Sequence, residues 1–194
     1  MPDGLDERQR RMWGWMNKGC GVNMVVFDPS SATGNGCQIL YVAVSIMNRE
    51  NLFRSFDGGK TWSPVPNQPQ QYRPTHMILA NDGNLFISYG DNPGPGRMTN
   101  GAVWKLNTKS DEWTDITPDK PDATNQFGYA SLSVFATDPK MVIVSTHYRP
   151  HEAGGDDIFR STDGGKTWKT VFSNGTEYDY SKAPYVQRTG IHWM

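Results

Sequence analysis

The chain has 194 residues with 19 basic and 20 acidic side chains, so its formal net charge is −1. This balance lacks the electrostatic footprint of a protein that binds nucleic acid or an anionic membrane, and we expect neither as a partner. Aromatic residues make up 12% of the chain, beside 20 Gly and 13 Pro, which is typical of a turn-rich β protein and not of a helical bundle or a disordered tail.

The first 75 residues contain a leader-like segment and then a group of strand signals. Residues 1–21 include no continuous apolar stretch of the kind that a secretory signal peptide needs. We interpret them as a leader or as a segment of a preceding blade. Residues 22–75 contain four short β-rich runs, VVFDPSSA, QILYVAVS, NLFRS and TWSPVP, separated by turn residues. Runs of this length and composition predict four strands.

The same pattern recurs twice. Residues 76–129 hold a degenerate copy (HMILANDG, NLFISYG, AVWKLN, DEWTDITP), and residues 130–190 hold a close one (SVFATDPK, MVIVSTH, DIFRS, TWKTVF). A tryptophan followed three residues later by a β-branched residue marks each copy: Trp62 and Val65, Trp113 and Ile116, Trp168 and Val171. Four strands per ~50 residues predict β-propeller blades. The predicted fold is all-β: a partial β-propeller of three four-stranded antiparallel blades, with residues 191–194 opening a fourth.

Two octapeptides, SFDGGKTW at 55–62 and STDGGKTW at 161–168, are nearly identical. They resemble the Asp-box, which lies on the turn between the third and fourth strands of a blade. The aspartates can accept hydrogen bonds from the amides of their own turn, and the glycines permit positive φ. A calcium loop needs oxygen ligands spread over about twelve residues, so this turn is too short. We therefore assign a structural role to Ser55, Asp57, Gly59, Thr61, Trp62, Ser161, Asp163, Gly165, Thr167 and Trp168.

Ligand-binding residues are expected on the rim opposite the Asp-boxes. The loops from second to third strands and from blade to blade are the long ones, and binding commonly resides in long loops on a rigid scaffold. Their tyrosines could stack on sugar rings while the Arg and His side chains bind hydroxyl groups, although about half of these rings are expected to pack between blades. The candidates are Tyr72, Arg73, Tyr89, His147, Tyr148, Arg149, Tyr180, Tyr185 and Trp193.

No cofactor or metal is expected. The sequence contains no P-loop, dinucleotide fingerprint or Gly-x-Ser-x-Gly motif. His147 and His151 are four residues apart, but in a loop with Pro and Gly instead of a helix, so their spacing does not predict a zinc site.

Beyond the Asp-boxes, three segments resemble glycoside hydrolase family 74, the xyloglucan-cleaving glucanases: GAVWKLNTKSDEWTDITP, DDIFRSTDGGKTW and YDYSKAPYVQRTGIHWM, at 101–118, 156–168 and 178–194. The resemblance covers nearly the whole chain from residue 22. It implies a secreted (extracellular or periplasmic) hydrolase of β-1,4-glucan or xyloglucan-type plant polysaccharide, built from two seven-bladed propellers with a cleft between them. This chain would form part of the N-terminal propeller.

The chain also departs from the family pattern. The triplet His147-Tyr148-Arg149 stands where the family tends to have paired tryptophans, so a stacking subsite is expected to differ. The resemblance places one catalytic aspartate before residue 1 and the other after residue 194, and Asp57 and Asp163 do not correspond to them. The segment is therefore expected to supply cleft wall without catalytic residues, to be inactive alone, and to have a polysaccharide or oligosaccharide and the remaining blades of its parent chain as partners.

Two other functions remain open. One is a non-catalytic glycan- or protein-binding propeller, as in sortilin-like receptors. The other, a sialidase, is least favoured because no Arg-Ile-Pro-type motif occurs. In every case three blades cannot close a ring, so two apolar sheet flanks should be exposed, and we expect the isolated chain to aggregate or self-associate.

Overall fold

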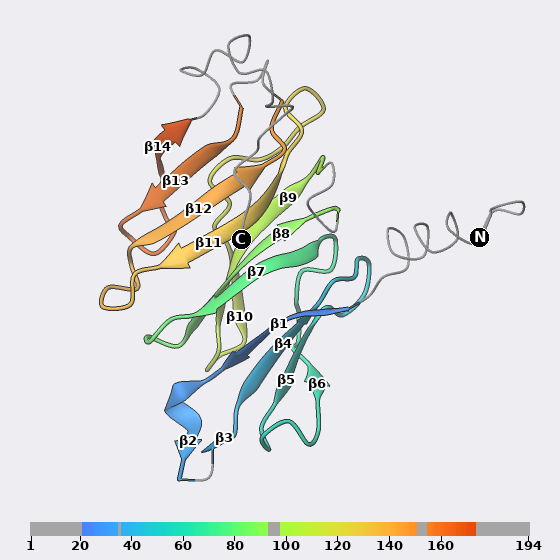
Figure 1. Ribbon diagram of the computed structural model, residues 1–194, viewed down its shortest axis with the longest axis vertical. Helices are drawn as coiled ribbons and strands as arrows, with labels where there is room; N and C mark the ends of the chain where they lie inside the picture. Colours follow the sequence, from blue (N-terminus) through green and yellow to red (C-terminus); the bar gives the residue numbers. More distant parts are fainter. Residues whose placement is uncertain (1–20, 35, 93–97, 151–154, 174–194) are drawn as a thin grey trace, which may run out of the picture.

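The computed structural model describes residues 21–34, 36–92, 98–150 and 155–173. Three four-stranded antiparallel sheets follow one another along the chain, and Figure 1 shows them lying one beside the next. In each sheet the strand order is a simple meander, apart from the small hairpin β2–β3 between the first two strands of the first sheet. The prediction of an all-β partial propeller is confirmed.

We call the sheets blades 1, 2 and 3. Blade 1 consists of β1 (Val22–Phe27), β4 (Leu40–Val44), β5 (Leu52–Ser55) and β6 (Ser63–Pro64), with a 3-10 turn η1 (Pro29–Ser31) and the hairpin β2 (Ala32–Thr33) and β3 (Gly36–Cys37) inserted. Blade 2 consists of β7 (Arg73–Leu79), β8 (Asn84–Gly90), β9 (Gly101–Asn107) and β10 (Glu112–Asp115). Blade 3 consists of β11 (Gly128–Val134), β12 (Val142–His147), β13 (Asp157–Ser161) and β14 (Lys169–Ser173).

The first strands of blades 2 and 3 begin slightly earlier than the sequence suggests. The boundaries expected between residues 75 and 76 and between 129 and 130 fall inside β7 and β11. A bulge interrupts the pairing of each strand after its second residue, Pro74 in β7 and Tyr129 in β11. Regular pairing resumes only beyond the bulge.

Two apolar cores lie between the blades. One fills the space between blades 1 and 2 and includes Tyr41, Leu52, Val65, Met77 and Ile87; the other lies between blades 2 and 3 and includes Phe86, Val103, Ile116, Leu132 and Val144. Neighbouring residues of β8 contribute to opposite cores because successive side chains of a strand point to opposite faces. Blade 2 is thus buried on both faces, whereas the described residues cover one face each of blades 1 and 3.

Side-chain hydrogen bonds reinforce both joints between blades. The indole Nε1 of Trp113 donates to the carbonyl of Pro66 at 2.9 Å, and that of Trp168 to the carbonyl of Ile116 at 2.8 Å. Bulges in the first strands of blades 1 and 2 form a second link. Asn23 Nδ2 donates to the carbonyl of Pro74 and Thr75 Oγ1 to that of Tyr129, both at 2.6 Å. The tryptophan that marks each repeat therefore ties a blade to its predecessor in blades 2 and 3.

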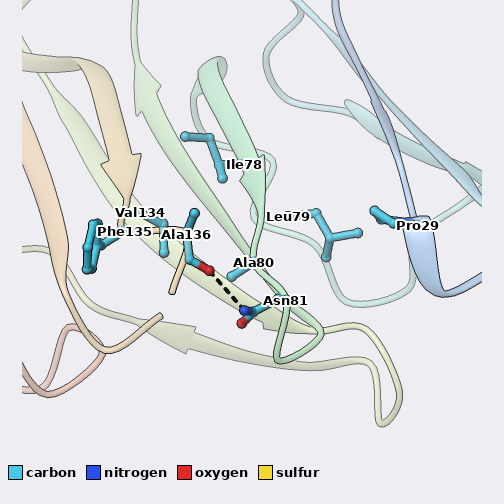
Figure 2. Close-up of a pocket in the computed structure, with 8 residues that line it drawn as sticks. All are labelled: Pro29, Ile78, Leu79, Ala80, Asn81, Val134, Phe135 and Ala136. Carbon is cyan, nitrogen blue, oxygen red and sulfur yellow. Dashed lines mark hydrogen bonds between the residues drawn. The ribbon is translucent and has the colours of Figure 1, made fainter. Parts of the chain in front are cut away.

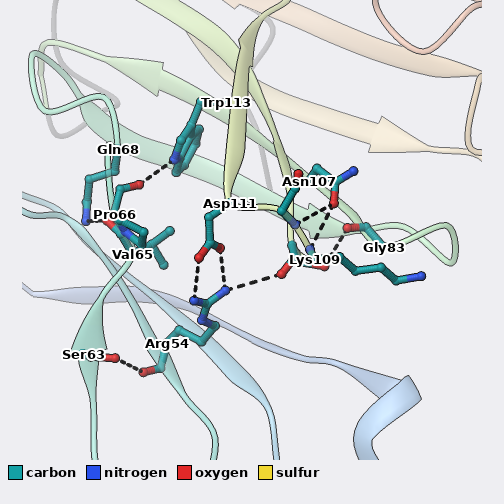
Figure 3. Close-up of polar contacts among 12 residues, drawn as sticks. Arg54, Ser63, Val65, Pro66, Gln68, Gly83, Asn107, Lys109, Asp111 and Trp113 are labelled. Carbon is teal, nitrogen blue, oxygen red and sulfur yellow. Dashed lines mark hydrogen bonds and ion pairs between the residues drawn. The ribbon is translucent and has the colours of Figure 1, made fainter.

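A basic side chain of the third strand clamps the next blade. Figure 3 shows Arg54 of β5 paired with both carboxylate oxygens of Asp111, at 2.7 and 3.0 Å, in the turn between β9 and β10. Lys105 of β9 occupies the corresponding place in blade 2, and its Nζ donates to the carbonyl of Gly164 at 3.1 Å. Within the described part of the chain, no helix is long and apolar enough to cross a membrane.

Candidate functional site

The Asp-box turns have the closed geometry that the sequence predicts. Oδ1 of Asp57 accepts the amides of Lys60 and Thr61, both at 2.9 Å, and the hydroxyl of Ser55 at 2.8 Å. Oδ2 accepts the Thr61 hydroxyl at 2.6 Å. Asp163 makes the same four contacts in the second box. Because both carboxylate oxygens are bound within their own turn, the structural role assigned to the box agrees with its geometry.

Hydrogen bonding also sets the charge state of these turns. The Thr61 side chain, then its amide and the Ser55 hydroxyl, hold the pKa of Asp57 well below its ordinary value, and Asp163 behaves in the same way. Such bonds favour the ionised form because every partner donates a proton to the carboxylate. The two glycines of each box have positive φ, from 72° to 90°, a conformation that suits glycine.

The Asp-boxes share one rim with the turns that join first and second strands. The Gly58 amide donates to the carbonyl of Gln38 and the Gly164 amide to that of Lys140, each at 2.9 Å. The loops 45–51, 91–100 and 148–156 and the connections 66–72 and 117–127 leave the opposite ends of the strands. We call this opposite side the loop rim, and it carries the candidate ligand-binding residues that the structure describes.

Two candidates are buried and unavailable to a surface ligand. Tyr89 is fully enclosed in the core between blades 1 and 2, and burial raises the pKa of its hydroxyl. His147, the last residue of β12, is 1% exposed and contacts the Tyr148 ring edge-on. The expectation that these two side chains face a ligand is corrected: both are buried, Tyr89 in the core between blades 1 and 2, and a loop-flanking position in the sequence does not reveal such burial.

Arg149 is a structural centre of the loop rim. Its guanidinium binds the carboxylates of Asp119, in the connection after blade 2, and Asp157, at the start of β13. The same group lies over the Phe127 ring, 4.2 Å from its centroid, and the side chain is only 6% exposed. A guanidinium that is already paired with two carboxylates orders the loops around it, so this candidate positions the rim.

Tyr72 and Arg73 lie where blade 1 meets blade 2. The Tyr72 hydroxyl donates to Oδ1 of Asn100 at 3.0 Å, and burial together with the nearby Asp91 carboxylate raises the pKa of that hydroxyl. Arg73 Nη1 donates to the carbonyl of Ser45 at 3.0 Å. Tyr72 thus presents a half-buried ring beside an exposed amide, an arrangement suited to a sugar, whereas Arg73 ties the loop 45–51 to β7.

The loop 98–101 is held by a contact that sequence reasoning missed. Met98 is fully buried, and a Cβ on either Gly90 or Gly128 would lie 2.6 Å from its sulfur. Both glycines therefore make room for one side chain that anchors the loop carrying Asn100. The glycines are visible in the sequence, but they lie in different blades, so only the fold indicates that they share a neighbour.

Tyr148 is the remaining described candidate. It follows β12 with φ 71°, and its amide donates to Asp156 Oδ2 at 3.3 Å. The ring is partly exposed on the loop rim. Tyr180, Tyr185 and Trp193 lie outside the described residues, as does His151. The structure therefore brings Tyr72 together with Asn100, and Arg149 together with two aspartates.

A shallow hollow of about 240 Å³ lies on the rim that carries the Asp-boxes, where the first strands of blades 2 and 3, β7 and β11, end. Figure 2 shows its apolar lining, with Asn81 Nδ2 donating to the carbonyl of Ala136 at 2.9 Å across the gap. No ionisable side chain lines it. No group of three His, Cys, Asp or Glu within 21–34, 36–92, 98–150 and 155–173 is arranged to hold a metal ion.

Comparison with known proteins agrees with this architecture. The family model "BNR/Asp-box repeat" matches residues 53–64 and 159–170. A xyloglucanase from Acetivibrio thermocellus is 43% identical over 179 residues, covering 86% of this chain, and one from Paenibacillus is 41% identical over 156 residues, covering 78%. The crystal structure of the family 74 xyloglucanase from Xanthomonas campestris superposes with a TM-score of 0.74 at 38% identity over 78% of the chain.

This chain is homologous to the family 74 glycoside hydrolases. It spans 21% of the length of the Acetivibrio relative, 15% of the Paenibacillus relative and 21% of the Xanthomonas chain. The resemblance seen in the sequence is thereby confirmed, and the homology extends across all three blades. The match is to one part of much longer family 74 proteins.

Proposed function

We propose that this chain forms part of the substrate-binding wall of a secreted glycoside hydrolase that acts on β-1,4-glucan or xyloglucan-type polysaccharide. The observation that carries the proposal is the 43% identity to a xyloglucanase over 179 residues. A match that covers 86% of the chain extends into all three blades. The substrate class is taken from those relatives.

The loop rim has the chemistry that such a wall requires. Tyr72 offers an aromatic face and Asn100 an amide, two groups that suit the apolar and hydroxyl faces of a sugar. Arg149 and its two carboxylate partners hold the adjoining loops in place. Because these groups are ordered by the blades, little conformational entropy would be lost when a saccharide binds.

The catalytic carboxylates are supplied, in this proposal, by other parts of the parent protein. Inverting glycosidases use an acid and a base roughly 6.5–9.5 Å apart on opposite sides of the scissile bond. Asp57 and Asp163 are unsuited to that role because hydrogen bonds within their turns keep both ionised and occupied. The purified 194-residue chain should therefore not hydrolyse xyloglucan.

A chimeric enzyme tests the proposal. The homologous segment of the Acetivibrio xyloglucanase is replaced by residues 21–173 of this chain, and xyloglucan hydrolysis is measured by release of reducing ends. Retained hydrolysis, lowered mainly through a raised KM, supports a wall that binds substrate. A folded chimera without hydrolysis would contradict the proposal and favour a non-catalytic binding propeller.

Tyr72→Ala in the same chimera locates the binding surface. We expect a rise in KM on the order of tenfold, equivalent to about 1.4 kcal/mol of lost binding energy, because one stacking face is removed. Lys166→Ala, an exposed position on the Asp-box rim, is the matched control and should leave KM unchanged. Equal effects of the two substitutions would exclude the loop rim as the binding surface.

A further inference from the structure

The loop rim contains an asparagine followed by a glycine, Asn100-Gly101, directly at the start of β9. This pair of residues is chemically labile, because glycine has no side chain to shield its backbone nitrogen from the amide carbon of the preceding asparagine. Four pairs of Asp or Asn with Gly lie wholly within the described residues, and their geometries can be compared: Asp57-Gly58, Asp82-Gly83, Asn100-Gly101 and Asp163-Gly164.

The glycine amide faces the preceding side chain at one of these four pairs. Gly101 N donates to Oδ1 of Asn100 at 2.9 Å. A backbone N–H can only donate, so the atom that it faces is the amide oxygen, and the amide carbon bonded to that oxygen lies close to the Gly101 nitrogen. Reacting groups that are already held together need little further ordering to react. In the other pairs the glycine amide donates to a distant backbone carbonyl: Gly58 to Gln38, Gly83 to Ala80 and Gly164 to Lys140.

A second donor polarises the same carbonyl group of Asn100. The Tyr72 hydroxyl donates to Oδ1 at 3.0 Å. When a nucleophile adds to a carbonyl carbon, negative charge develops on the oxygen, and a donor already aimed at that oxygen stabilises the charge. Asn100 is exposed, so water can reach the group. The site thus combines a nearby nucleophile, a polarised carbonyl and access for water.

Packing between the blades holds the pair in this arrangement. A Cβ on Gly101 would collide with the Tyr89 carbonyl and would lie 2.9 Å from Cα of Gly128, so the fold requires glycine at this position. The Asp91 amide donates to the backbone carbonyl of Asn100 at 3.0 Å. These neighbours belong to blade 2 and to blade 3. The surroundings of the pair therefore do not depend on further blades of the parent protein.

We propose that Asn100 is a site of spontaneous deamidation in the folded protein. The Gly101 nitrogen loses its proton to solvent and forms a bond to Cγ of Asn100. The bond from Cγ to Nδ2 breaks, and Nδ2 leaves as ammonia, which closes a succinimide ring. Water then adds to one of the two ring carbonyl carbons and opens the ring. In total, an amide and a water molecule become a carboxylate and ammonium, without an oxidant, a reductant or an enzyme.

The fold should also decide which product forms. Addition of water at Cγ restores the normal chain with aspartate, whereas addition at the backbone carbon gives isoaspartate, in which an extra atom enters the main chain. That atom would have to fit between position 100 and Gly101, where Tyr89 and Gly128 are already in close contact. We therefore expect a higher ratio of aspartate to isoaspartate in the folded chain than in a free peptide of the same sequence.

Deamidation would change the chemistry of the loop rim. A carboxylate at position 100 has no N–H groups, and it adds a negative charge near Asp91. Its effect on hydrolysis rests on the proposed function, in which the Asn100 amide binds saccharide hydroxyl groups. In the chimeric enzyme, Asn100→Asp should raise KM about fivefold, the factor of one ordinary hydrogen bond. An unchanged KM would exclude the amide as a saccharide ligand, and the modification itself is measured independently by mass.

Peptide mapping of the purified 194-residue chain is the test. The chain and a synthetic peptide of residues 98–105 are incubated at mildly alkaline pH in heavy-oxygen water until the peptide is fully converted. The chain is then digested with trypsin in ordinary water, which releases residues 98–105 as one peptide with Asn100 as its only side-chain amide. Heavy oxygen in the new carboxylate shows that the reaction preceded digestion. Conversion at Asn100 is expected, and an amide that stays intact in the folded chain overturns the inference.

Variants separate the role of the fold from that of the two-residue motif. Tyr72→Phe removes the donor to Oδ1 and should slow conversion about fivefold. Tyr148→Phe, at another partly exposed tyrosine of the loop rim, is the matched control and should not change the rate. Asn100→Gln should not convert, because its longer side chain would have to close a larger ring. A rate in Tyr72→Phe equal to or above that of the parent chain, or a product ratio equal to that of the free peptide, would contradict activation by the fold. Urea unfolding of each variant establishes that the blades are intact.

Discussion

Val65 and Val171 are the same residue at equivalent places in two blades, and they provide a matched test of the blade joints. Val65 is 1% exposed in the core between blades 1 and 2, whereas Val171, in β14 of blade 3, is 44% exposed. Valine to threonine replaces a methyl group with a hydroxyl of nearly equal size. The substitution therefore changes polarity while leaving the volume and the β-branching of the side chain the same.

The magnitude follows from burial. Val65→Thr loses the transfer free energy of one buried methyl group, about 0.8 kcal/mol, and buries a hydroxyl, which costs about 1–3 kcal/mol in protein mutational data. We expect the free energy of unfolding to fall by about 2–3 kcal/mol. Val171→Thr leaves its hydroxyl in contact with water, so the change should stay within about 0.5 kcal/mol.

Equilibrium urea unfolding, followed by tryptophan fluorescence, measures both variants against the parent chain. Reversibility and a common slope with denaturant are required for the comparison. Equal losses of stability in the two variants would refute the assignment of Val65 to a buried joint between blades and of Val171 to an exposed position.

Three further results are expected. Gly101→Ala should lower the free energy of unfolding by at least about 2 kcal/mol in urea titrations, because its Cβ would lie 2.3 Å from the Tyr89 carbonyl, whereas Gly21→Ala meets nothing within 4 Å and should be neutral. Because the pKa of Asp57 and Asp163 is lowered on folding, their ionised forms stabilise the protein above the ordinary carboxyl pKa of about 4, and this stabilisation is lost as the pH falls toward the lower folded pKa. Replacing both by Asn should lower Tm at pH 7 and reduce the decrease of Tm with falling pH in the acid range. Arg149→Met leaves two carboxylates unpaired and should cost about 2–3 kcal/mol, with Arg149→Lys recovering only part of it.

Several features of this protein follow from local sequence alone. Strand alternation, the turn residues and the repeated octapeptide predict four-stranded blades and the Asp-box geometry, because period-2 burial and turn conformation depend on residues close in the chain. The contacts inside the Asp57 turn span at most four residues.

The candidate site could be predicted only in outline. The loops that carry it follow from topology, but the sequence treats Tyr72 and Tyr89 alike, as tyrosines near loop ends. The first is half-buried beside Asn100 and the second is enclosed by a neighbouring blade. Arg149, expected to bind a ligand, is instead paired with carboxylates from two separate segments. Local pattern carries no information on contacts between segments that are brought together by blade packing.

The sequence by itself determined the blade, its Asp-box and the family to which it is homologous, because each depends on motifs that are complete within one repeat. Only the tertiary structure decided what lies between the blades. Val65, Ile116 and Val171 share one sequence signature, yet the first two are buried and the third is exposed. The physical reason is that burial on a blade face requires a following blade, which blades 1 and 2 have and which blade 3 lacks among the described residues.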